Sequence, residues 1–407
     1  MQTSFSSEFI QTKDGQRVDN ILRNCVHCGF CNATCPTYQL TGDELDGPRG
    51  RIYLIKNFFE NSDNQVAHNI SLKHLDRCLT CMACETTCPS GVKYGELVDI
   101  GRKQINSTGK RSLKEKLKRN LILYFFSNST RTYILLSVAR LVKYFLPHAI
   151  AKKIPAKIKF GAVTEQPNNT KRSKNTNLLT IKGCVQDSLA PQINHATKLV
   201  LNQSGYNIDE SNARCCGAMA FHLTELEKAH KTIRENIDEW HNKLKNGYDN
   251  ILINSSGCSV FIKQYATILQ DDPEYNQKAK YISDHCIDLS EITSSIATKI
   301  SDKHGKTVAF HSPCTLQHGQ KINGRIEKKL REAGYTLVEV QDSHLCCGSA
   351  GTYSLLEKEL SAQLLTNKVH HLEKNQPDFI ATANIGCLLH LQSGTDIPVK
   401  HWVELLR

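Results

Sequence analysis

The sequence of 407 residues predicts a multidomain protein of mixed α+β and α/β class, with a small helical domain first and two repeated α/β domains after it. Three observations predict this fold. Two nearly identical groups of four cysteines lie within residues 1–109. A different cysteine pattern occurs twice in residues 176–407, at almost constant spacing. In that second region short strand-like runs alternate with helical patterns, which is typical of a parallel sheet.

Composition divides the chain into four segments. Residues 1–109 are rich in cysteine, whereas residues 110–175 contain no cysteine and are basic. Residues 176–300 and 301–407 form an internal duplication. We expect a helical cysteine-rich domain, then a basic helical connector that ends in a linker at 161–175, then two copies of an α/β domain.

Cysteine usage indicates bound metal in a reducing compartment. The chain has 17 cysteines, and its polar N-terminus lacks the apolar core and cleavage site of a secretory signal. Grouped thiols that stay reduced usually bind metal. We find no apolar run of roughly 18 residues, the length that a membrane-spanning helix needs. We therefore expect a cytoplasmic metalloprotein.

The strongest motif is Cys-x-x-Cys-x-x-Cys-x-x-x-Cys-Pro, which occurs at residues 25–36 and again at residues 78–89. This is the spacing of bacterial ferredoxins with two [4Fe–4S] clusters, in which the fourth cysteine of each motif binds the other cluster. The first predicted ligand set is Cys25, Cys28, Cys31 and Cys88, and the second is Cys78, Cys81, Cys84 and Cys35. A zinc site fits less well, because zinc ribbons use two CxxC pairs separated by a long spacer.

The insert of 42 residues between the two motifs resembles that of the helical type of ferredoxin domain found in succinate dehydrogenase. Residues 46–48 (Asp-Gly-Pro) predict a turn, and the run after them predicts a helix. Arg49 and Arg51 follow this turn. They either offset the negative charge of thiolates and clusters or begin a solvated helix. Gly29, in the first cysteine loop, lets backbone N–H groups approach the cluster sulfurs.

The second cysteine pattern is an internal repeat. Each copy has a single cysteine, then Cys-Cys-Gly, then another single cysteine, and equivalent cysteines are offset by 130, 131 and 129 residues. Three nearly equal offsets indicate a true duplication. The cysteines are Cys184, Cys215, Cys216 and Cys258 in the first copy, and Cys314, Cys346, Cys347 and Cys387 in the second.

Strand-like runs precede most of these cysteines, and helical patterns separate them. The predicted strands are Leu178–Ile181, Ile251–Ile253, Val308–Phe310, Tyr335–Val340 and Phe379–Ala381, and the longest predicted helices are 222–246 and 355–374. The cysteines then lie at the carboxyl ends of parallel strands, the edge that carries the ligand crevice in open α/β sheets.

The repeat resembles the cysteine-rich CCG domain of heterodisulfide reductase and its relatives. In those proteins such domains bind an unusual iron–sulfur cluster or form an active site. The fuller CCG pattern ends in Cys-x-x-Cys, whereas this sequence has Ser255 and Asn384 in place of the first cysteine of that pair. Two interpretations stay open: a further iron–sulfur cluster, or a docking or acceptor site without one.

Other residues near the repeats have less certain roles. His311, His318 and His344 lie near the second set of cysteines, where they could bind an acceptor such as a quinone or be structural. Cys286 has no counterpart in the other copy, so we expect a buried small residue.

The sequence lacks the motifs of nucleotide and flavin sites. No GxGxxG follows a strand, and neither a P-loop nor a GxSxG motif is present. Without a flavin or NAD site the chain handles single electrons, and a partner must perform the two-electron chemistry.

The net charge of +11 is concentrated in one segment. Residues 110–160 contain 13 lysines and arginines and one acid, a net charge of +12. Ile134, Val138, Leu141 and Phe145 recur there at helical spacing. The pattern favours contact with an anionic membrane face, although a partner subunit or a core helix with a charged face would also explain it. Because the cysteine motifs are not basic, we expect no nucleic acid. A zinc-dependent interaction module or nucleic-acid-binding module is the alternative from another class.

Four stretches together resemble the iron–sulfur subunit of glycolate oxidase: VHCGFCNATCPTYQLTGDELDGPRGRIYLIK (26–56), HLDRCLTCMACETTCPSGV (74–92), HSPCTLQH (311–318) and DSHLCCGSAGTY (342–353). The resemblance implies a hetero-oligomer whose FAD-containing subunits oxidise glycolate to glyoxylate. It implies that this chain passes electrons towards an acceptor, membrane quinone, at the cytoplasmic face of the inner membrane. Iron–sulfur subunits of anaerobic glycerol-3-phosphate dehydrogenase and of lactate-utilisation systems share the layout and are the nearest alternative.

Overall fold

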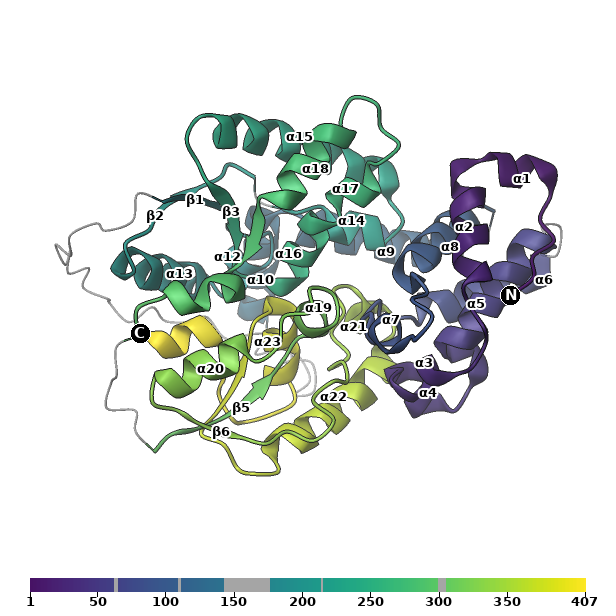
Figure 1. Ribbon diagram of the computed structural model, residues 1–407. Coiled ribbons are helices and arrows are strands. Elements are labelled where there is room, and N and C mark those ends of the chain that lie inside the picture. Colours follow the sequence, from purple (N-terminus) through teal and green to yellow (C-terminus); the bar gives the residue numbers. More distant parts are fainter. Residues whose placement is uncertain (62–64, 109–110, 143–175, 214, 299–304) are drawn as a thin grey trace.

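The computed structural model describes the chain except for residues 62–64, 109–110, 143–175, 214 and 299–304. A helical N-terminal domain lies against two α/β units, each with a parallel sheet (Figure 1). The predicted class, a multidomain protein with helical and α/β parts, is confirmed. Phe145 and the linker predicted at 161–175 lie outside the described residues.

The N-terminal domain consists of short helices joined by the two cysteine loops. Its elements are α1 (Ser7–Gln11), α2 (Lys13–Arg23), α3 (Phe30–Ala33), α4 (Pro36–Thr41), η1 (Glu44–Asp46), α5 (Pro48–Glu60), α6 (Gln65–Asp76), α7 (Ala83–Thr87) and α8 (Tyr94–Thr108). Pro48 begins α5, where a missing N–H costs nothing, so the predicted turn followed by a helix is confirmed. Ile52, Ile55 and Phe58 recur at helical spacing on α5 and pack against α6 and α8 in one buried core.

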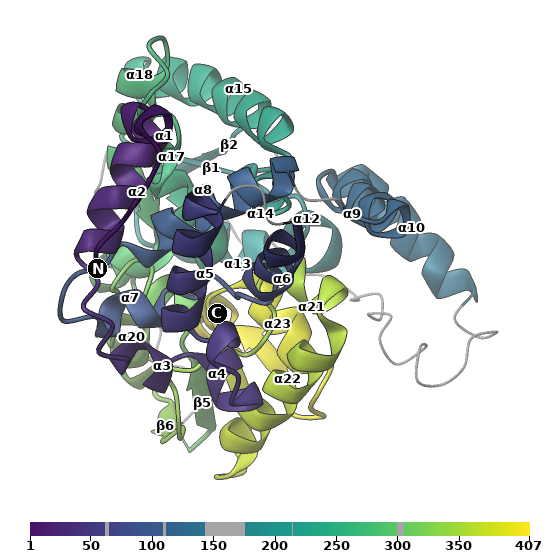
Figure 2. The ribbon, with the colours of Figure 1, turned by 90° about the vertical axis from the view of Figure 1, so that its right-hand side faces the viewer.

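Two helices of the basic connector follow. They are α9 (Leu113–Phe126) and α10 (Ser129–Val142), and they extend from the body of the molecule (Figure 2). The carboxylate of Asp76 anchors α9 to the N-terminal domain, since it pairs with Arg111 at 2.6 Å and Arg119 at 2.9 Å. The helical connector is therefore confirmed over the part of it that the structure describes.

Each repeat contains a four-stranded parallel sheet with the same strand order, β2-β1-β3-β4 in the first and β6-β5-β7-β8 in the second. The strands are β1 (Asn177–Thr180), β2 (Asn207–Glu210), β3 (Asn250–Ile253), β4 (Cys286–Asp288), β5 (Thr307–His311), β6 (Thr336–Val338), β7 (Phe379–Thr382) and β8 (Val399–His401). Register is repeated too, because Leu178 pairs with Asn250 and Val308 pairs with Phe379. All five predicted strands occur; the unpredicted ones, β2, β4 and β8, are short edge strands.

Helices connect the strands on both faces of the sheets. The first repeat contains α12 (Gln186–Leu189), α13 (Gln192–Gln203), α14 (Ala218–His222), α15 (Leu226–Lys245), α16 (Ser256–Lys263), α17 (Tyr265–Ile268), α18 (Asn276–Asp284) and η3 (Leu289–Ser295). The second contains α19 (Cys314–Gln317), α20 (Arg325–Glu332), α21 (Tyr353–Leu356), α22 (Lys358–Glu373), α23 (Ile385–Gln392) and η4 (Trp402–Leu406). The helices predicted at 222–246 and 355–374 are α15 and α22, which begin a few residues later.

The two repeats pack against each other reciprocally. The last element of the first repeat, η3, contacts α20 of the second, and the last element of the second, η4, contacts α13 of the first. Ile193, Val200, Ile326 and Trp402, from both repeats, belong to one continuous core. Cys347 and Cys387 of the second repeat belong to this core, whereas Cys216 of the first repeat lies in a separate core.

Candidate iron–sulfur sites

Five cysteines of the N-terminal domain line one cavity. They are the first predicted ligand set, Cys25, Cys28, Cys31 and Cys88, together with Cys84 of the second set. Burial raises the pKa of the Cys31 thiol to about 11, and the neighbouring Cys25 and Cys88 contribute to the shift. Thiolates held this close repel one another unless a cationic centre lies among them. The donor set fits an iron–sulfur cluster.

The second predicted set lines an adjacent cavity and comprises Cys35, Cys78, Cys81 and Cys84. Cys84 lines both cavities, so the two sites are neighbours. Burial raises the pKa values of Cys81 and Cys84 well above the ordinary thiol value. The structure thus brings together each group of four cysteines that the motif spacing predicts.

The two cysteine loops share an uncommon backbone. In the first loop His27 and Gly29 have φ angles of 56° and 84°, and at the matching positions of the second loop Thr80 and Met82 have φ angles of 50° and 61°. Residues other than glycine rarely adopt this left-handed backbone conformation. It turns backbone N–H groups inward, and the Thr80 N–H lies 3.5 Å from the sulfur of Cys78. In the first loop the His27 N–H likewise hydrogen-bonds the Cys25 sulfur, so both loops present a donor; the expected role of the Gly29 N–H stays a prediction.

Gly29 meets a second requirement, because Arg49 lies against it. The Arg49 Nη1 atom is 2.6 Å from the place where a β-carbon on residue 29 would stand. Arg49 is partly exposed and pairs with Glu44 at 2.6 Å. Arg49 therefore covers the first cavity without being buried in it.

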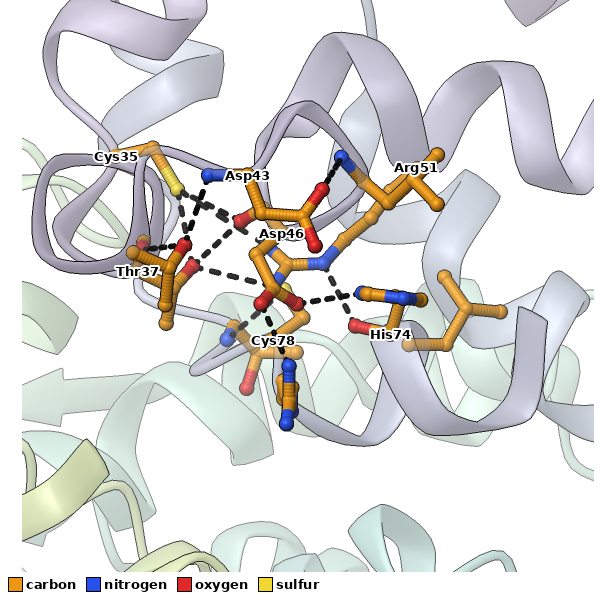
Figure 3. Close-up of polar contacts among 12 residues, drawn as sticks. Cys35, Thr37, Asp43, Asp46, Arg51, His74 and Cys78 are labelled. Atoms are coloured by element: carbon orange, nitrogen blue, oxygen red, sulfur yellow. Dashed lines mark hydrogen bonds and ion pairs between the residues drawn. The ribbon is translucent and has the colours of Figure 1, made fainter. Parts of the chain in front are cut away.

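Arg51 is a buried cation that lines the second cavity. Figure 3 shows its polar contacts. Its side chain is 1% exposed. The guanidinium donates to the backbone oxygen of His74 at 2.8 Å and to the Thr37 hydroxyl at 3.1 Å, and Nη1 lies 3.9 Å from the sulfur of Cys35. The carboxylate of Asp46, fully buried, is 3.6 Å away. Of the two interpretations of the sequence, Arg51 fits the one in which it offsets thiolate charge.

Arg51 also acts on Cys78. Burial alone would raise the pKa of the Cys78 thiol, but the guanidinium groups of Arg51 and Arg102 lower it below its ordinary value. Donation from the Tyr94 hydroxyl, 3.6 Å from the sulfur, adds to the effect. Since the thiolate is the form that binds metal, this environment favours metal binding.

The four cysteines of the first repeat also lie together. The Cys184 and Cys216 thiols hydrogen-bond to Cys215, and Cys216 is hydrogen-bonded to Cys258 as well. These bonds lower the pKa of Cys215, and so does the Gly217 N–H, whose nitrogen lies 3.4 Å from the Cys215 sulfur. This arrangement is consistent with the prediction that the repeat cysteines lie together at one edge of the sheet.

The second repeat holds its cysteines in the same series but more deeply. The sulfurs of Cys314 and Cys346 are 3.8 Å apart, and hydrogen bonds continue from Cys346 to Cys347 and on to Cys387. All four are buried. Cys81 of the N-terminal domain packs with Cys314 and Cys346 in one buried cluster. The second ferredoxin cavity is therefore next to the second repeat.

The structure separates the three histidines that lie near this set in the sequence. His318 places one ring nitrogen 2.9 Å from the Thr86 hydroxyl and the other 2.9 Å from the backbone oxygen of His344, so it links the second repeat to the N-terminal domain. His311 lies elsewhere, beside Cys347 and Cys387. His318 and His344 therefore lie together, whereas His311 lies with the cysteines; binding of an acceptor by these histidines stays a prediction.

Cys286 is 3% exposed in β4, which confirms the expected buried small residue.

Lys368 was not identified from the sequence. It is 2% exposed on α22 and lies beside Cys346. Nothing in the sequence distinguishes it from the many exposed lysines, because its burial depends on how α22 packs.

Known domain families match three parts of the chain. A 4Fe-4S dicluster domain matches residues 21–92, and a cysteine-rich domain matches residues 178–263 and 308–392. Along its whole length the chain is 45% identical to the glycolate oxidase iron-sulfur subunit of Escherichia coli K12, of which it covers 98%. The chain belongs to the family of glycolate oxidase iron–sulfur subunits.

More distant relatives match all or part of the chain. The probable glycolate oxidase iron-sulfur subunit of Bacillus subtilis is 30% identical over 97% of the chain and 94% of its own length. Lactate utilization protein A of Geobacillus kaustophilus is 26% identical but matches 55% of the chain. The chain is thus an iron–sulfur protein that serves in an oxidoreductase. Among the described helices, none has the length and apolar character to cross a membrane.

Proposed function

We propose that this chain is the electron-transfer subunit of a glycolate oxidase complex. It receives single electrons from FAD-containing partner subunits that oxidise glycolate to glyoxylate, and it passes them towards an acceptor, membrane quinone. The observation that carries the proposal is the packing of Cys81 with Cys314 and Cys346. Because the two ferredoxin cavities also share Cys84, three groups of thiols form one continuous series through the interior.

In this proposal each ferredoxin cavity holds one [4Fe–4S] cluster, which supplies one-electron storage. The first set of ligands is Cys25, Cys28, Cys31 and Cys88, and the second is Cys35, Cys78, Cys81 and Cys84. The chain's own residues orient and stabilise the thiolates: the left-handed loops supply N–H donors, and Arg51 supplies a buried positive charge.

Glycolate is the proposed donor because the two relatives named for glycolate oxidase combine the higher identities, 45% and 30%, with matches over nearly the whole chain. Both relatives named for glycolate oxidase match nearly all of the chain, whereas Lactate utilization protein A matches 55% of it. A lactate or glycerol-3-phosphate complex is the alternative. Assaying the reconstituted complex with all three donors distinguishes these.

The connector is the proposed contact with the cytoplasmic face of the inner membrane. On α9 the exposed apolar side chains Leu113, Leu117, Leu121 and Tyr124 recur at helical spacing. Exposed lysines lie between them. An apolar stripe with interspersed lysines is typical of a helix that lies in an anionic membrane surface.

The relay is tested by removing one ligand. In the complete complex, Cys81→Ser is expected to lower glycolate-dependent quinone reduction at least tenfold, while reduction of an artificial dye by the flavoprotein subunits continues. Cys286→Ser is the matched control, because Cys286 is a buried cysteine outside the proposed sites. Equal loss of both activities in Cys81→Ser would show that the cysteine serves only the structure.

A further inference from the structure

We infer that the second repeat holds an iron–sulfur centre of its own, ligated by the imidazole of His311 together with its four cysteines, and that the first repeat lacks this histidine-ligated centre. The role of such a centre rests on the electron-transfer function proposed above. Its existence depends only on the donor atoms of the second repeat.

His311 has the burial and surroundings of a ligand. It is the last residue of β5 and is 2% exposed. One of its ring nitrogens lies within 4.8 Å of the sulfurs of both Cys347 and Cys387. Neither ring nitrogen has a hydrogen-bond partner among the described residues. A buried polar group without a partner is costly, and coordination of a metal by imidazole removes that cost.

A second buried histidine shows that missing partners alone are not sufficient. His68 is 4% exposed, and its ring nitrogens also lack partners among the described residues. Its ring packs on that of Phe58, with centroids 4.6 Å apart. Within the described part of the chain, His68 belongs to no group of potential metal ligands, whereas His311 does. The thiols beside His311 make the difference.

The first repeat provides an internal comparison. The offset of 130 residues that relates Cys184 to Cys314 relates Ile181 to His311. Ile181 is 3% exposed and packs in the core of the first repeat with Cys216. The two copies thus share four cysteines, but only the second has an imidazole at this position.

The charge at the second repeat is also unbalanced without an anionic centre. Lys368 is 2% exposed, and its ammonium donates to the backbone oxygen of Asp342 at 2.6 Å. Among the described residues it forms no ion pair within 4 Å; the Cys347 and Cys346 thiols, and the Asp342 carboxylate from farther away, are among the groups that act on its charge. A buried charge without an opposite charge is costly. Lys368 borders the cavity at Cys346, where thiolates would neutralise it.

The equivalent helix of the first repeat brings no such charge. The side chains that α15 buries are Ala229, Ile233, Asn236, Ile237, Trp240 and Leu244, all of them uncharged. Those buried by α22 are Ser361, Leu364, Lys368, Val369 and Leu372. Both differences between the copies, the imidazole and the ammonium, therefore favour an anionic metal centre in the second repeat.

Asn384 explains why an additional ligand is needed there. It stands where the fuller CCG pattern has a cysteine, and its amide donates to the sulfur of Cys387 at 3.5 Å. Asn384 therefore orients a ligand instead of binding metal. His311 approaches the same sulfur from β5 and supplies a nitrogen donor in place of the missing thiolate.

The test measures the metal and its ligands in the anaerobically purified full chain. Iron and acid-labile sulfide should exceed the amount in two cubanes, about eight iron atoms per chain. Pulsed paramagnetic resonance of protein labelled with ¹⁵N-histidine should detect nitrogen coupling to a reduced centre. His311→Ile, which installs the residue of the first repeat, should lower that coupling at least tenfold and reduce iron to about eight atoms. His68→Ile, the matched buried control, should leave both unchanged.

A second variant distinguishes loss of the histidine ligand from misfolding. His311→Cys offers a thiolate in place of the imidazole, so it should retain the additional iron while losing the nitrogen coupling. Cys216→Ser, in the first repeat, should retain the coupling.

The outcomes separate this inference from the proposed function. Wild-type protein with about eight iron atoms and no nitrogen coupling would overturn the inference and leave the dicluster relay intact. Additional iron whose signal is unchanged in His311→Ile, or stoichiometric zinc in place of additional iron, would also overturn it. Protein without iron would overturn the proposed function itself.

Discussion

The Ser255 hydroxyl donates a hydrogen bond to the side-chain oxygen of Asn384 at 2.8 Å, and the two residues occupy equivalent positions in the two repeats. Ser255 precedes α16 and Asn384 precedes α23, so the N-termini of two equivalent helices meet. The same oxygen accepts a bond from the Gly257 N–H at 3.3 Å. The two departures from the fuller CCG pattern therefore join the repeats to each other.

This pair should be energetically coupled. We expect Ser255→Ala and Asn384→Ala each to destabilise the repeats, and the double variant to lose about 1 kcal/mol less than the sum, because one shared hydrogen bond is counted twice. The chain's two tryptophans, Trp240 and Trp402, are buried one in each repeat, so their fluorescence in urea reports this unfolding. Additive losses would show that the bond does not hold the repeats together.

Removing Arg51 should affect both stability and redox potential. Arg51→Met removes one of the cations around the buried carboxylate of Asp46, and we expect the free energy of unfolding to fall by about 3 kcal/mol. Loss of a cation beside Cys35 and Cys78 should also make the adjacent cluster harder to reduce, which a redox titration followed by paramagnetic resonance would detect. Arg49→Met is the control: its pair with Glu44 is partly exposed, so its cost should stay below about 1 kcal/mol. Equal effects of the two substitutions would contradict the assigned roles.

The spacing of the cysteines was sufficient to predict which cysteines line each ferredoxin cavity, because three of each group lie on one short loop that constrains their geometry and the fourth comes from the other motif. The strands β1, β3, β5 and β7 were predictable for a similar reason. They are central and buried, so their sequences are apolar runs. The edge strands β2, β4 and β8 lack that signal and were missed, whereas the edge strand β6 was predicted from the run Tyr335–Val340.

Contacts between distant segments could not be predicted. Arg49 and Arg51 have the same local context, and only the packing of α5 on α6 decides that Arg51 is buried. His311 and His318 belong to one short motif, yet they face different groups because a strand ends and a helix begins between them. The meeting of Ser255 with Asn384 depends on how two whole repeats pack.

The positive charge of Lys368 should stabilise the proposed iron–sulfur centre of the second repeat. If thiolates neutralise its ammonium, Lys368→Met should lower the potential of the additional centre or its iron content, with the two cubanes unchanged. Lys329→Met is the control, since Lys329 is also buried and donates to a backbone oxygen at 2.6 Å, but has Glu332 at 3.3 Å. Redox titration and iron analysis of both variants provide the measurement. A larger effect on iron from Lys329→Met would argue that Lys368 serves only packing.

The apolar stripe of α9 should bind anionic lipid. The double variant Leu117→Glu, Leu121→Glu should reduce cosedimentation with vesicles that contain phosphatidylglycerol at least tenfold. Two negative charges then replace apolar side chains that would enter the lipid surface. Val66→Glu, at an exposed apolar residue on α6, is the control. Neutral phosphatidylcholine vesicles should bind the wild-type chain weakly. Unchanged lipid binding, with loss of the flavoprotein subunits instead, would assign this surface to a partner.

His401 should make the C-terminal half sensitive to acid. It is fully buried, burial lowers its pKa from 6.5 to about 3, and its ring accepts a hydrogen bond from the Val403 N–H that caps η4. Because the folded pKa lies below the unfolded value, unfolding takes up a proton at any pH between the two. The stability that depends on neutral His401 is therefore complete above about pH 6.5 and decreases as the pH falls towards 3, by about 1 kcal/mol at pH 5.5.

The substitution that tests this is His401→Asn, because asparagine also caps helices well. Urea midpoints of the tryptophan signal at pH 7.5 and pH 5.5 should differ less in this variant than in the wild-type chain, by about 1 kcal/mol. His195→Asn, at a partly exposed histidine, controls for the loss of an imidazole elsewhere in the repeats. If both variants respond to pH as the wild-type chain does, acid destabilisation originates at another group and the burial of His401 has no part in it.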